Sequence, residues 1–504
     1  MKRIYLILSL VLSMMASACN EWLDMPSNEY IFEDEAFSSN RGFRSALVGT
    51  YRLVGSENLW GRELTWGFLS VIGRNYNPSM LPTQYRQAIT DEDYENPAYV
   101  KPILDSIWKT GYNVIANCNN ILKNIDNLED AAFEYPWEKE MITAEAKALR
   151  ALMHFELMRL FVPAPITGFT GKAIPYSETH PDVHPGYKTM EEIFERVIAD
   201  LKEAKEVLKR VDVDILWEPT IMNYISTPLF YGIQNLREDG TYGNGLGFFS
   251  FRGFRMNYWG VTALLGRVYS YKRDNATAVQ YINELLDEWE GEDDIGWGWY
   301  QYNSNPNSIS GKRIPEPVIS FWNTQAYTIY ENALKALTNS FRMISLTELF
   351  KGDEEDYRYK GLYNTLTQRY RVWERPTDPA YSFSLTSSSV LYGGPLLPVL
   401  ELPELYYIRC EYLAEQGRID EAIAMLKTVK DNRNITSAIV ANDYDSFMRV
   451  LIKDATRDFL TRGQTWHYLK KLNWKEMYNG TTVPWTAPDS WYVLPIPDSE
   501  INFN

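Results

Sequence analysis

The sequence predicts a mainly α-helical protein, built as a scaffold of tetratricopeptide-like helical pairs with long irregular ligand-binding loops. Three observations support this fold class. Apolar residues recur at spacings of three and four over long segments, which is typical of amphipathic helices. Two segments contain two such patterns around a short turn, whereas three long stretches show no such period. The 504 residues include no Ser/Gly-rich or Pro-rich linker, so we expect a single folded domain.

The chain opens with the features of an export signal. Two basic residues precede an apolar run (Ile4–Met15) that is too short for a membrane-spanning helix of about 20 residues. The small residues Ala-Ser-Ala follow, and then Cys19. A cysteine directly after such a site favours a lipoprotein, whose acylated N-terminal cysteine holds it on a membrane. A soluble exported protein with a chance cysteine is the alternative. We predict a signal peptide over residues 1–18 and lipidation of Cys19.

Two long helical patterns follow in the first half of the chain. AEAKALRALMHFELMRLF, residues 144–161, places leucines and methionines on one stripe and stops before Pro163. MEEIFERVIADLKEAKEVLKR, residues 190–210, has acidic residues early and basic residues late, as the helix dipole favours. Both segments are predicted to be helices.

Two later segments predict helix-turn-helix units. Residues 257–288 contain two helical patterns with a turn at Asp274-Asn275, and residues 401–430 contain two with a turn at Gly417. The second unit has roughly tetratricopeptide spacing. Such repeats cannot bury their apolar faces singly and stack into a curved solenoid.

Between the helices lie three stretches without clear periodicity, residues 60–102, 211–257 and 290–341. They are too aromatic for disorder, and long loops of this kind tend to be functional. Aromatic residues make up 14% of the chain, and an aromatic face can stack on the apolar face of a sugar. The candidate ligand-binding residues in these stretches are Trp66, Arg74, Tyr76, Tyr85, Trp297, Trp299, Tyr300, Trp322 and Tyr327. For each aromatic residue, ordinary core packing is the competing interpretation. Trp108, Trp259 and Trp466 lie in helical patterns and are expected in the core.

The charge argues against nucleic acid as a partner, and the cysteine content argues against a disulfide-stabilised fold. The net charge of −16 becomes −18 when the two basic residues of the signal are removed, and such a surface repels nucleic acid. The mature chain keeps Cys118 and Cys410 besides Cys19. Cysteines in helical patterns are usually small buried side chains, and two of them do not make a disulfide framework.

Sequence motifs of catalysis and of metal binding are absent. There is no G-x-S-x-G elbow, H-E-x-x-H helix, P-loop or C-x-x-C pair. A glycoside hydrolase needs only two carboxylates placed by the fold, so that alternative stays open. GDEEDYR, residues 352–358, lacks the alternating spacing of a calcium loop and predicts a solvated acidic turn. His180 and His184 are each followed by proline and predict no metal site.

Several segments together resemble a known family. In order they are CNEWLD, AEAKALRALMHFELMRLFVPAPI, GVTALLGRVYSYKRDNATAV, ELFKGDEEDYR, the helical pair around Gly417, RDFLTRGQTWHYLKK and VLPIPDSEINFN. Over nearly the whole mature chain this series resembles the SusD/RagB-like family of outer-membrane nutrient-binding lipoproteins. The helix ending in Phe-x-x-x-Pro and the terminal Leu-Pro-Ile-Pro-x-x-Glu-Ile are the most specific pieces.

The resemblance implies one SusD-like domain over residues 19–504, with a helical part (19–210), a loop-rich part (211–345) and a second helical part (346–504). It implies a cell-surface protein, tethered to the outer membrane by Cys19, that captures oligosaccharide or polysaccharide. The implied partner is a TonB-dependent transporter of the SusC type. Neither catalysis nor a cofactor is implied.

The sequence departs from the family pattern at two places. The family commonly has Arg three residues before the Glu of its penultimate helix, where this chain has Glu401 before Glu404. Near the C-terminus, the Glu, Arg and Asp of the family pattern are replaced by Arg462, Thr465 and Tyr468. We therefore expect a rebuilt polar network. The departures leave the ligand class open, and a peptide-binding or transporter-assembly module is the alternative function.

Overall fold

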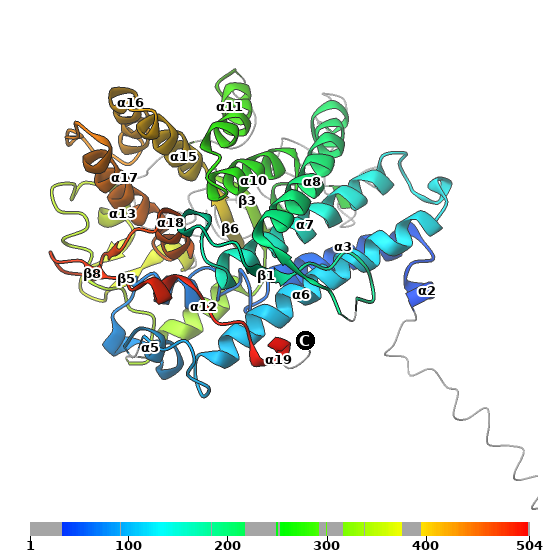
Figure 1. Cartoon of the computed structure of the whole chain (residues 1–504), viewed down its shortest axis with the longest axis horizontal. Coiled ribbons are helices and arrows are strands. Elements are labelled where there is room, and N and C mark those ends of the chain that lie inside the picture. The colour runs from blue at the N-terminus through cyan, green and yellow to red at the C-terminus, as the bar shows by residue number, and fades with distance from the viewer. Residues whose placement is uncertain are drawn as a thin grey trace, which may run out of the picture.

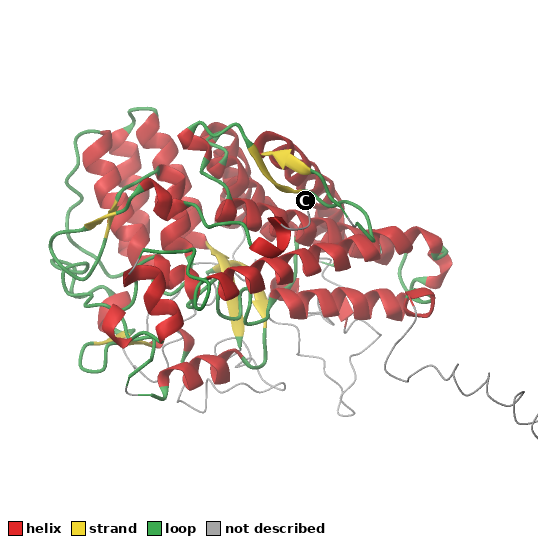
Figure 2. Cartoon of the chain, turned by 60° about the horizontal axis from the view of Figure 1, so that its bottom comes forward, coloured by secondary structure: helices red, strands yellow, loops and turns green. Residues whose placement is uncertain are grey.

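Helices predominate in the computed structural model, which describes residues 33–216, 248–249, 252–291, 299, 316–374 and 395–501, apart from residues 91, 183 and 337. Four two-stranded antiparallel sheets lie among the helices of the described part (Figure 1 and Figure 2). The longer helices are α3 (Asn40–Val54), α4 (Phe68–Ile72), α5 (Thr83–Thr90), α6 (Lys101–Asn124), α7 (Glu138–Phe161), α8 (Met190–Lys209), α10 (Tyr258–Tyr271), α11 (Asn275–Gly291), α12 (Ala326–Leu334), α15 (Leu402–Glu415), α16 (Ile419–Asp431), α17 (Tyr444–Phe459) and α18 (Gln464–Leu472). One-turn helices are α2 (Glu33–Ala36), α13 (Tyr357–Lys360) and α19 (Asp498–Ile501). The predicted mainly α-helical class is confirmed.

The scaffold is a succession of helices that pack on their neighbours along the chain. α7 packs on α6 and α8, α10 packs on α8 and α11, and α15 packs on α11, α16 and α17 (Figure 1). Each added helix covers the apolar face of the previous one, as in tetratricopeptide solenoids. The predicted helical-pair scaffold is therefore present.

Both predicted helix-turn-helix units form at the expected positions. α10 and α11 are separated by the turn at Asp274, and α10 begins where the side chain of Asn257 accepts a hydrogen bond from the Gly260 N–H at 2.8 Å. α15 and α16 are separated by Gly417, whose φ of 71° lies in the left-handed region that glycine adopts without strain.

α7 is the central helix and is buried on nearly all sides, rather than along one stripe. The buried charged residues of α7 are paired with partners inside the protein. Arg150 binds Asp200 of α8 through two hydrogen bonds of 2.8 and 2.9 Å. Glu145 accepts hydrogen bonds from Tyr51 of α3 and from Arg255, at 2.5 and 2.9 Å. A charge buried in this way is tolerated because it is paired and hydrogen-bonded.

The strands are short, and only one pair lies in the middle of the protein. The strands are β1 (Lys172–Pro175), β2 (Tyr187–Thr189), β3 (Pro317–Trp322), β4 (Tyr363–Asn364), β5 (Arg369–Tyr370), β6 (Leu396–Glu401), β7 (Glu476–Met477) and β8 (Trp485–Thr486). They pair antiparallel as β1–β2, β3–β6, β4–β5 and β7–β8. β3 and β6 are almost fully buried beneath the helices (Figure 1).

All three stretches predicted to be irregular contain some regular structure, which in residues 211–257 includes a π-helical segment (Arg210–Ile215) and a short 3-10 helix (Arg252–Phe254). Residues 60–102 include α4, α5 and the start of α6, and residues 290–341 include β3 and α12. These elements did not show in the sequence pattern because they are short and β3 pairs with a strand far along the chain. Most of residues 217–251, which belong to the stretch 211–257, lies outside the described residues.

The C-terminal helix α19 lies against α6 (Figure 1). Lys101 Nζ is 3.1 Å from Asp498, and Ser499 donates a 2.6 Å hydrogen bond to Asp105. One buried apolar cluster extends from Phe43 to Leu494. Among the described helices, none combines the length and apolar character needed to cross a membrane.

Candidate ligand-binding groove

Three of the predicted ligand aromatics meet in a buried cluster around Phe341. The ring centroids of Trp66, Tyr76 and Tyr85 lie 5.1, 5.3 and 5.0 Å from that of Phe341, in edge-to-face contacts. Tyr330 completes the cluster, 5.0 Å from Trp66. The three predicted residues are at most 4% exposed, so their faces are covered by protein in this structure. Here they stabilise the core beneath the loops.

The other predicted aromatics differ in exposure. Tyr327 is 4% exposed, while Trp322 is half-buried with its ring 4.7 Å from that of Phe254. Trp299 is also half-buried, 5.1 Å from the ring of Tyr406. Trp297, Tyr300 and the lipidation residue Cys19 lie outside the described residues. Ligand contact by these side chains stays a prediction. The residues expected in the core, Trp108, Trp259, Trp466, Cys118 and Cys410, are all buried.

Arg74 lies at the edge of a groove. Its backbone is in the left-handed region, with φ of 57°, and its guanidinium carbon is 3.4 Å from the ring centroid of Trp485. Its Nη2 is 3.3 Å from Glu92. Burial against the indole lowers the pKa of Arg74 without removing its charge at neutral pH. The guanidinium is held by stacking on the indole.

The groove has a volume of about 430 Å³ and is formed by four parts of the chain. They are the segment at Arg74, the segment 344–351, the helices α17 and α18, and the hairpin β7–β8. We call it the hairpin groove. Its size is in the range of pockets for small ligands.

Apolar and polar residues are separated in the hairpin groove. The apolar lining residues, mostly buried, are Ile344, Leu349, Ile452, Leu460 and Leu469. The polar residues are mostly exposed and include Glu348, Lys351, Arg449, Lys453, Glu476 and Thr481. Two half-buried aromatic residues, Trp474 and Tyr478, also line it. An apolar surface with an aromatic ring and surrounding polar groups matches the two kinds of surface on a sugar ring.

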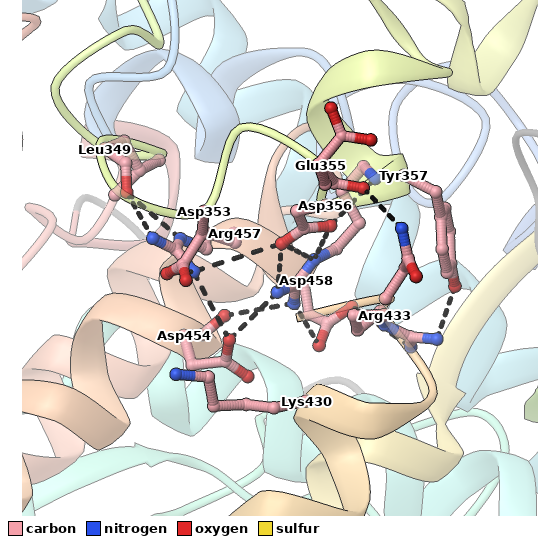
Figure 3. A network of polar contacts seen from close by, with 12 residues as sticks. Leu349, Asp353, Glu355, Asp356, Tyr357, Lys430, Arg433, Asp454, Arg457 and Asp458 are labelled. Carbon is pink, nitrogen blue, oxygen red and sulfur yellow. Dashed lines mark hydrogen bonds and ion pairs between the residues drawn. The ribbon is translucent and has the colours of Figure 1, made fainter. Parts of the chain in front are cut away.

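An ion-pair network holds one wall of the groove in place (Figure 3). Arg457 of α17 donates two hydrogen bonds, of 3.0 and 2.7 Å, to the carbonyl oxygen of Leu349. The same guanidinium is 2.8 Å from Asp353. The segment that carries Lys351 is thereby attached to α17, which also lines the groove.

The same network corrects the expectation of a solvated acidic turn at residues 352–358. Asp356 is fully buried and forms a 2.7 Å ion pair with Arg358, which also lies 2.9 Å from Asp454 and 2.8 Å from Asp458. Burial raises the pKa of Asp356, and Arg358 opposes that rise. The prediction was wrong for Asp353 and Asp356, because Arg457, distant in sequence, reaches Asp353, and the buried Arg358 of the turn itself pairs with Asp356. Among the described residues, no group of His, Cys, Asp and Glu is arranged to hold a metal ion.

The two departures in the C-terminal half meet in space. Arg462 Nε is 3.0 Å from Glu401 Oε2, and both side chains are at most 10% exposed. Glu404 instead pairs with Arg267 of α10, at 2.5 and 2.6 Å. The residue types at positions 401 and 462 are exchanged relative to the pattern described above, and the two side chains pair; the part of the expectation that concerns Thr465 and Tyr468 stays a prediction.

The groove residues Arg449, Lys453 and Trp474 were not among the predicted site residues. They belong to a part of the chain in which no candidate site residues were predicted from the sequence. The one local indication was the segment LNWKEMYNGTTVPW, residues 472–485, where aromatic residues and glycine interrupt the helical pattern.

Comparisons with known proteins agree with the fold. Residues 21–220 match a family model of SusD-like proteins described as "Starch-binding associating with outer membrane". A SusD superfamily protein from Bacteroides thetaiotaomicron has a TM-score of 0.65 at 18% identity, covering 92% of this chain and 98% of its own. A SusD-like carbohydrate-binding protein from Bacteroides vulgatus has a TM-score of 0.65 at 15% identity, covering 93% and 97%. A laminarin-binding SusD-like protein has a TM-score of 0.62 at 15% identity, covering 93% and 98%. No curated protein sequence matches the chain.

Proposed function

Because residues 21–220 match a SusD-like family model and the fold resembles that of SusD-like proteins, we propose that the chain is a cell-surface lipoprotein that captures an oligosaccharide or polysaccharide. It is anchored in the outer membrane through Cys19. It delivers the glycan to a TonB-dependent transporter of the SusC type and does not catalyse a reaction.

The observation that carries the proposal is the hairpin groove on a SusD-like scaffold. Trp474 supplies an aromatic surface, and Arg449 lies beside it, with its guanidinium carbon 5.2 Å from the ring centroid. Charged and hydroxyl side chains around the groove can bind sugar hydroxyls. The carbohydrate-binding neighbour and the laminarin-binding neighbour support a saccharide as the ligand class.

The aromatic segment around Trp297, Trp299 and Tyr300 is proposed as a second contact for an extended glycan. Trp322 is proposed with it, because its half-buried ring keeps part of its surface accessible. Trp66, Tyr76, Tyr85 and Tyr327 are buried in the core, and a direct contact with the glycan would require the core around them to open.

The proposal is tested by affinity gel electrophoresis of residues 20–504 in gels that each contain one plant, host or microbial polysaccharide. We expect at least one polymer to retard the protein without release of new reducing ends. Trp474→Ala should relieve the retardation if the polymer lies in the hairpin groove. A Trp297→Ala/Trp299→Ala variant tests the aromatic segment separately.

Tyr444→Ala is the matched control, because Tyr444 is an exposed aromatic residue on α17 that does not line the groove. This variant should migrate like the unmodified protein. Absence of retardation by every polymer would contradict glycan capture and favour the alternative of peptide binding or transporter assembly. Product release that disappears when one carboxylate is replaced would instead indicate a glycoside hydrolase.

A further inference from the structure

The hairpin groove is basic, although the protein as a whole is acidic. Four basic residues line it, Arg74, Lys351, Arg449 and Lys453, against two acidic residues, Glu348 and Glu476. The chain has a net charge of −16. A local excess of positive charge on such a protein is unexpected for a groove that holds only neutral sugars.

Ion pairs neutralise only part of this charge. Arg449 pairs with Glu476 at 2.5 Å, and Lys351 pairs with Glu348 at 3.3 Å. Within the described residues Lys453 forms no hydrogen bond or ion pair. Arg74 has its acidic neighbour Glu92 at 3.3 Å, outside the groove lining, so the positive charge that remains without an ion pair among the described residues of the groove is that of Lys453.

The surroundings of Lys453 disfavour its positive charge. Partial desolvation lowers the pKa of Lys453, and Arg457 one turn further along α17 lowers it as well, while Asp353 and Glu348 oppose the shift. An anion bound beside the ammonium group would offset both effects. The site therefore gains most from a ligand that carries negative charge.

We propose that the saccharide bound in the hairpin groove is acidic, with carboxylate or sulfate groups that pair with Lys453 and Arg74. This inference rests on the proposed function and specifies its ligand class. The apolar lining and Trp474 contact the sugar rings, while the cations bind the acidic substituents.

The negative charge of the whole protein is compatible with this ligand. Charges on the surface are screened beyond about 8 Å at physiological ionic strength, so the groove cations dominate the potential that a bound sugar experiences. Binding should consequently weaken as salt is added, more than binding of a neutral polymer would.

The test compares polymers that differ only in charge. Affinity electrophoresis of residues 20–504 would use polygalacturonate and its carboxyl-reduced neutral form, and a sulfated galactan and its desulfated form. We expect retardation by one acidic polymer, little by its neutral partner, and a loss of retardation with salt. The pair that retards the protein distinguishes carboxylate from sulfate.

Lys453→Gln removes the unpaired charge and should weaken binding of the acidic polymer about three- to tenfold, as expected for a partly exposed charged contact. Lys427→Gln is the control, because Lys427 is an exposed lysine on α16 outside the groove that pairs with Asp431. It should bind like the unmodified protein.

Equal retardation by an acidic polymer and its neutral form would overturn the acidic-ligand inference and leave glycan capture standing. An unchanged affinity of Lys453→Gln for the acidic polymer would also overturn it. Absence of retardation by all polymers, neutral ones included, would overturn the proposed function itself.

Discussion

Glu401 and Arg462 form a buried ion pair in which the two charges are exchanged relative to the family pattern. Breaking one partner of a buried pair typically costs about 3–5 kcal/mol, because the other charge stays buried without compensation. We expect Glu401→Arg and Arg462→Glu to lower the free energy of unfolding by at least that much. The double variant should recover most of the loss, because the pair is restored in the opposite sense.

Urea unfolding of the two single variants and the double variant measures this coupling. Destabilisation of the double variant by the sum of the single effects would show that the two side chains act independently. The exchange would then have no energetic connection with the 3.0 Å contact.

His154 is a second residue whose environment makes a prediction, here for pH. It is fully buried in α7, where its Nδ1–H donates to the carbonyl oxygen of Arg150 and its Nε2 accepts from the Ser177 N–H. Burial lowers its pKa to about 3, although the hydrogen bond to the Arg150 carbonyl opposes the shift. The imidazole is therefore neutral in the folded protein at any pH near neutrality.

As the pH falls below about 6.5, the usual pKa of histidine, the unfolded chain binds this proton and the folded chain does not. Stability is therefore lost as the pH falls from 7 to 5, and His154 accounts for about 2 kcal/mol of that loss. His154→Gln should reduce the difference in unfolding free energy between pH 7 and pH 5 by this amount. An unchanged difference would show that His154 is protonated in the folded protein.

At the scale of secondary-structure elements, Arg358 connects the turn at Asp356 with α17. It lies within 3 Å of Asp356, Asp454 and Asp458, and its side chain is fully buried. Arg358→Met leaves three carboxylates without their common partner. We expect this variant to lose about 3–5 kcal/mol of unfolding free energy, measured by urea denaturation.

Arg418→Met is the matched control for Arg358→Met. Arg418 pairs with Glu421 at 2.5 Å, but both side chains are about half-exposed, so the pair is well solvated. This variant should unfold at the same urea concentration as the unmodified protein. Equal effects of the two variants would mean that burial of the Arg358 network contributes nothing to stability.

The helical pairs could be predicted from sequence because their determinants are local. The apolar spacing, the cap at Asn257 and the turn at Gly417 all act within a few residues. The predicted helix at 190–210 corresponds to α8 for the same reason, since Thr189 and Glu192 form a capping box at its start.

The groove and the aromatic cluster could not be predicted in this way. The groove joins Arg74 to residues of α17 and of the β7–β8 hairpin, which are hundreds of positions away. Trp66, Tyr76 and Tyr85 carry the same aromatic rings that a sugar site would use, and only their burial around Phe341 assigns them to the core. Residue type indicated an aromatic region, whereas the fold decided which face each ring uses.

At the scale of the whole molecule, the proposed function includes attachment to the outer membrane, and the proposal assigns this attachment to Cys19. In the protein with Cys19 intact, several acyl chains on that cysteine would hold the protein firmly on the membrane, because each buried methylene contributes about 0.8 kcal/mol.

We therefore expect Cys19→Ser to release the protein from the outer-membrane fraction and to prevent incorporation of a labelled fatty acid. Cys118→Ser is the control, because Cys118 is buried in α6 and inaccessible to acylation. Saccharide binding by the released protein should be unchanged in affinity electrophoresis, since the groove lies in the folded part of the chain. Retention of Cys19→Ser in the membrane fraction after a high-salt wash would contradict lipid anchoring, because a protein held only by its transporter partner would behave in that way.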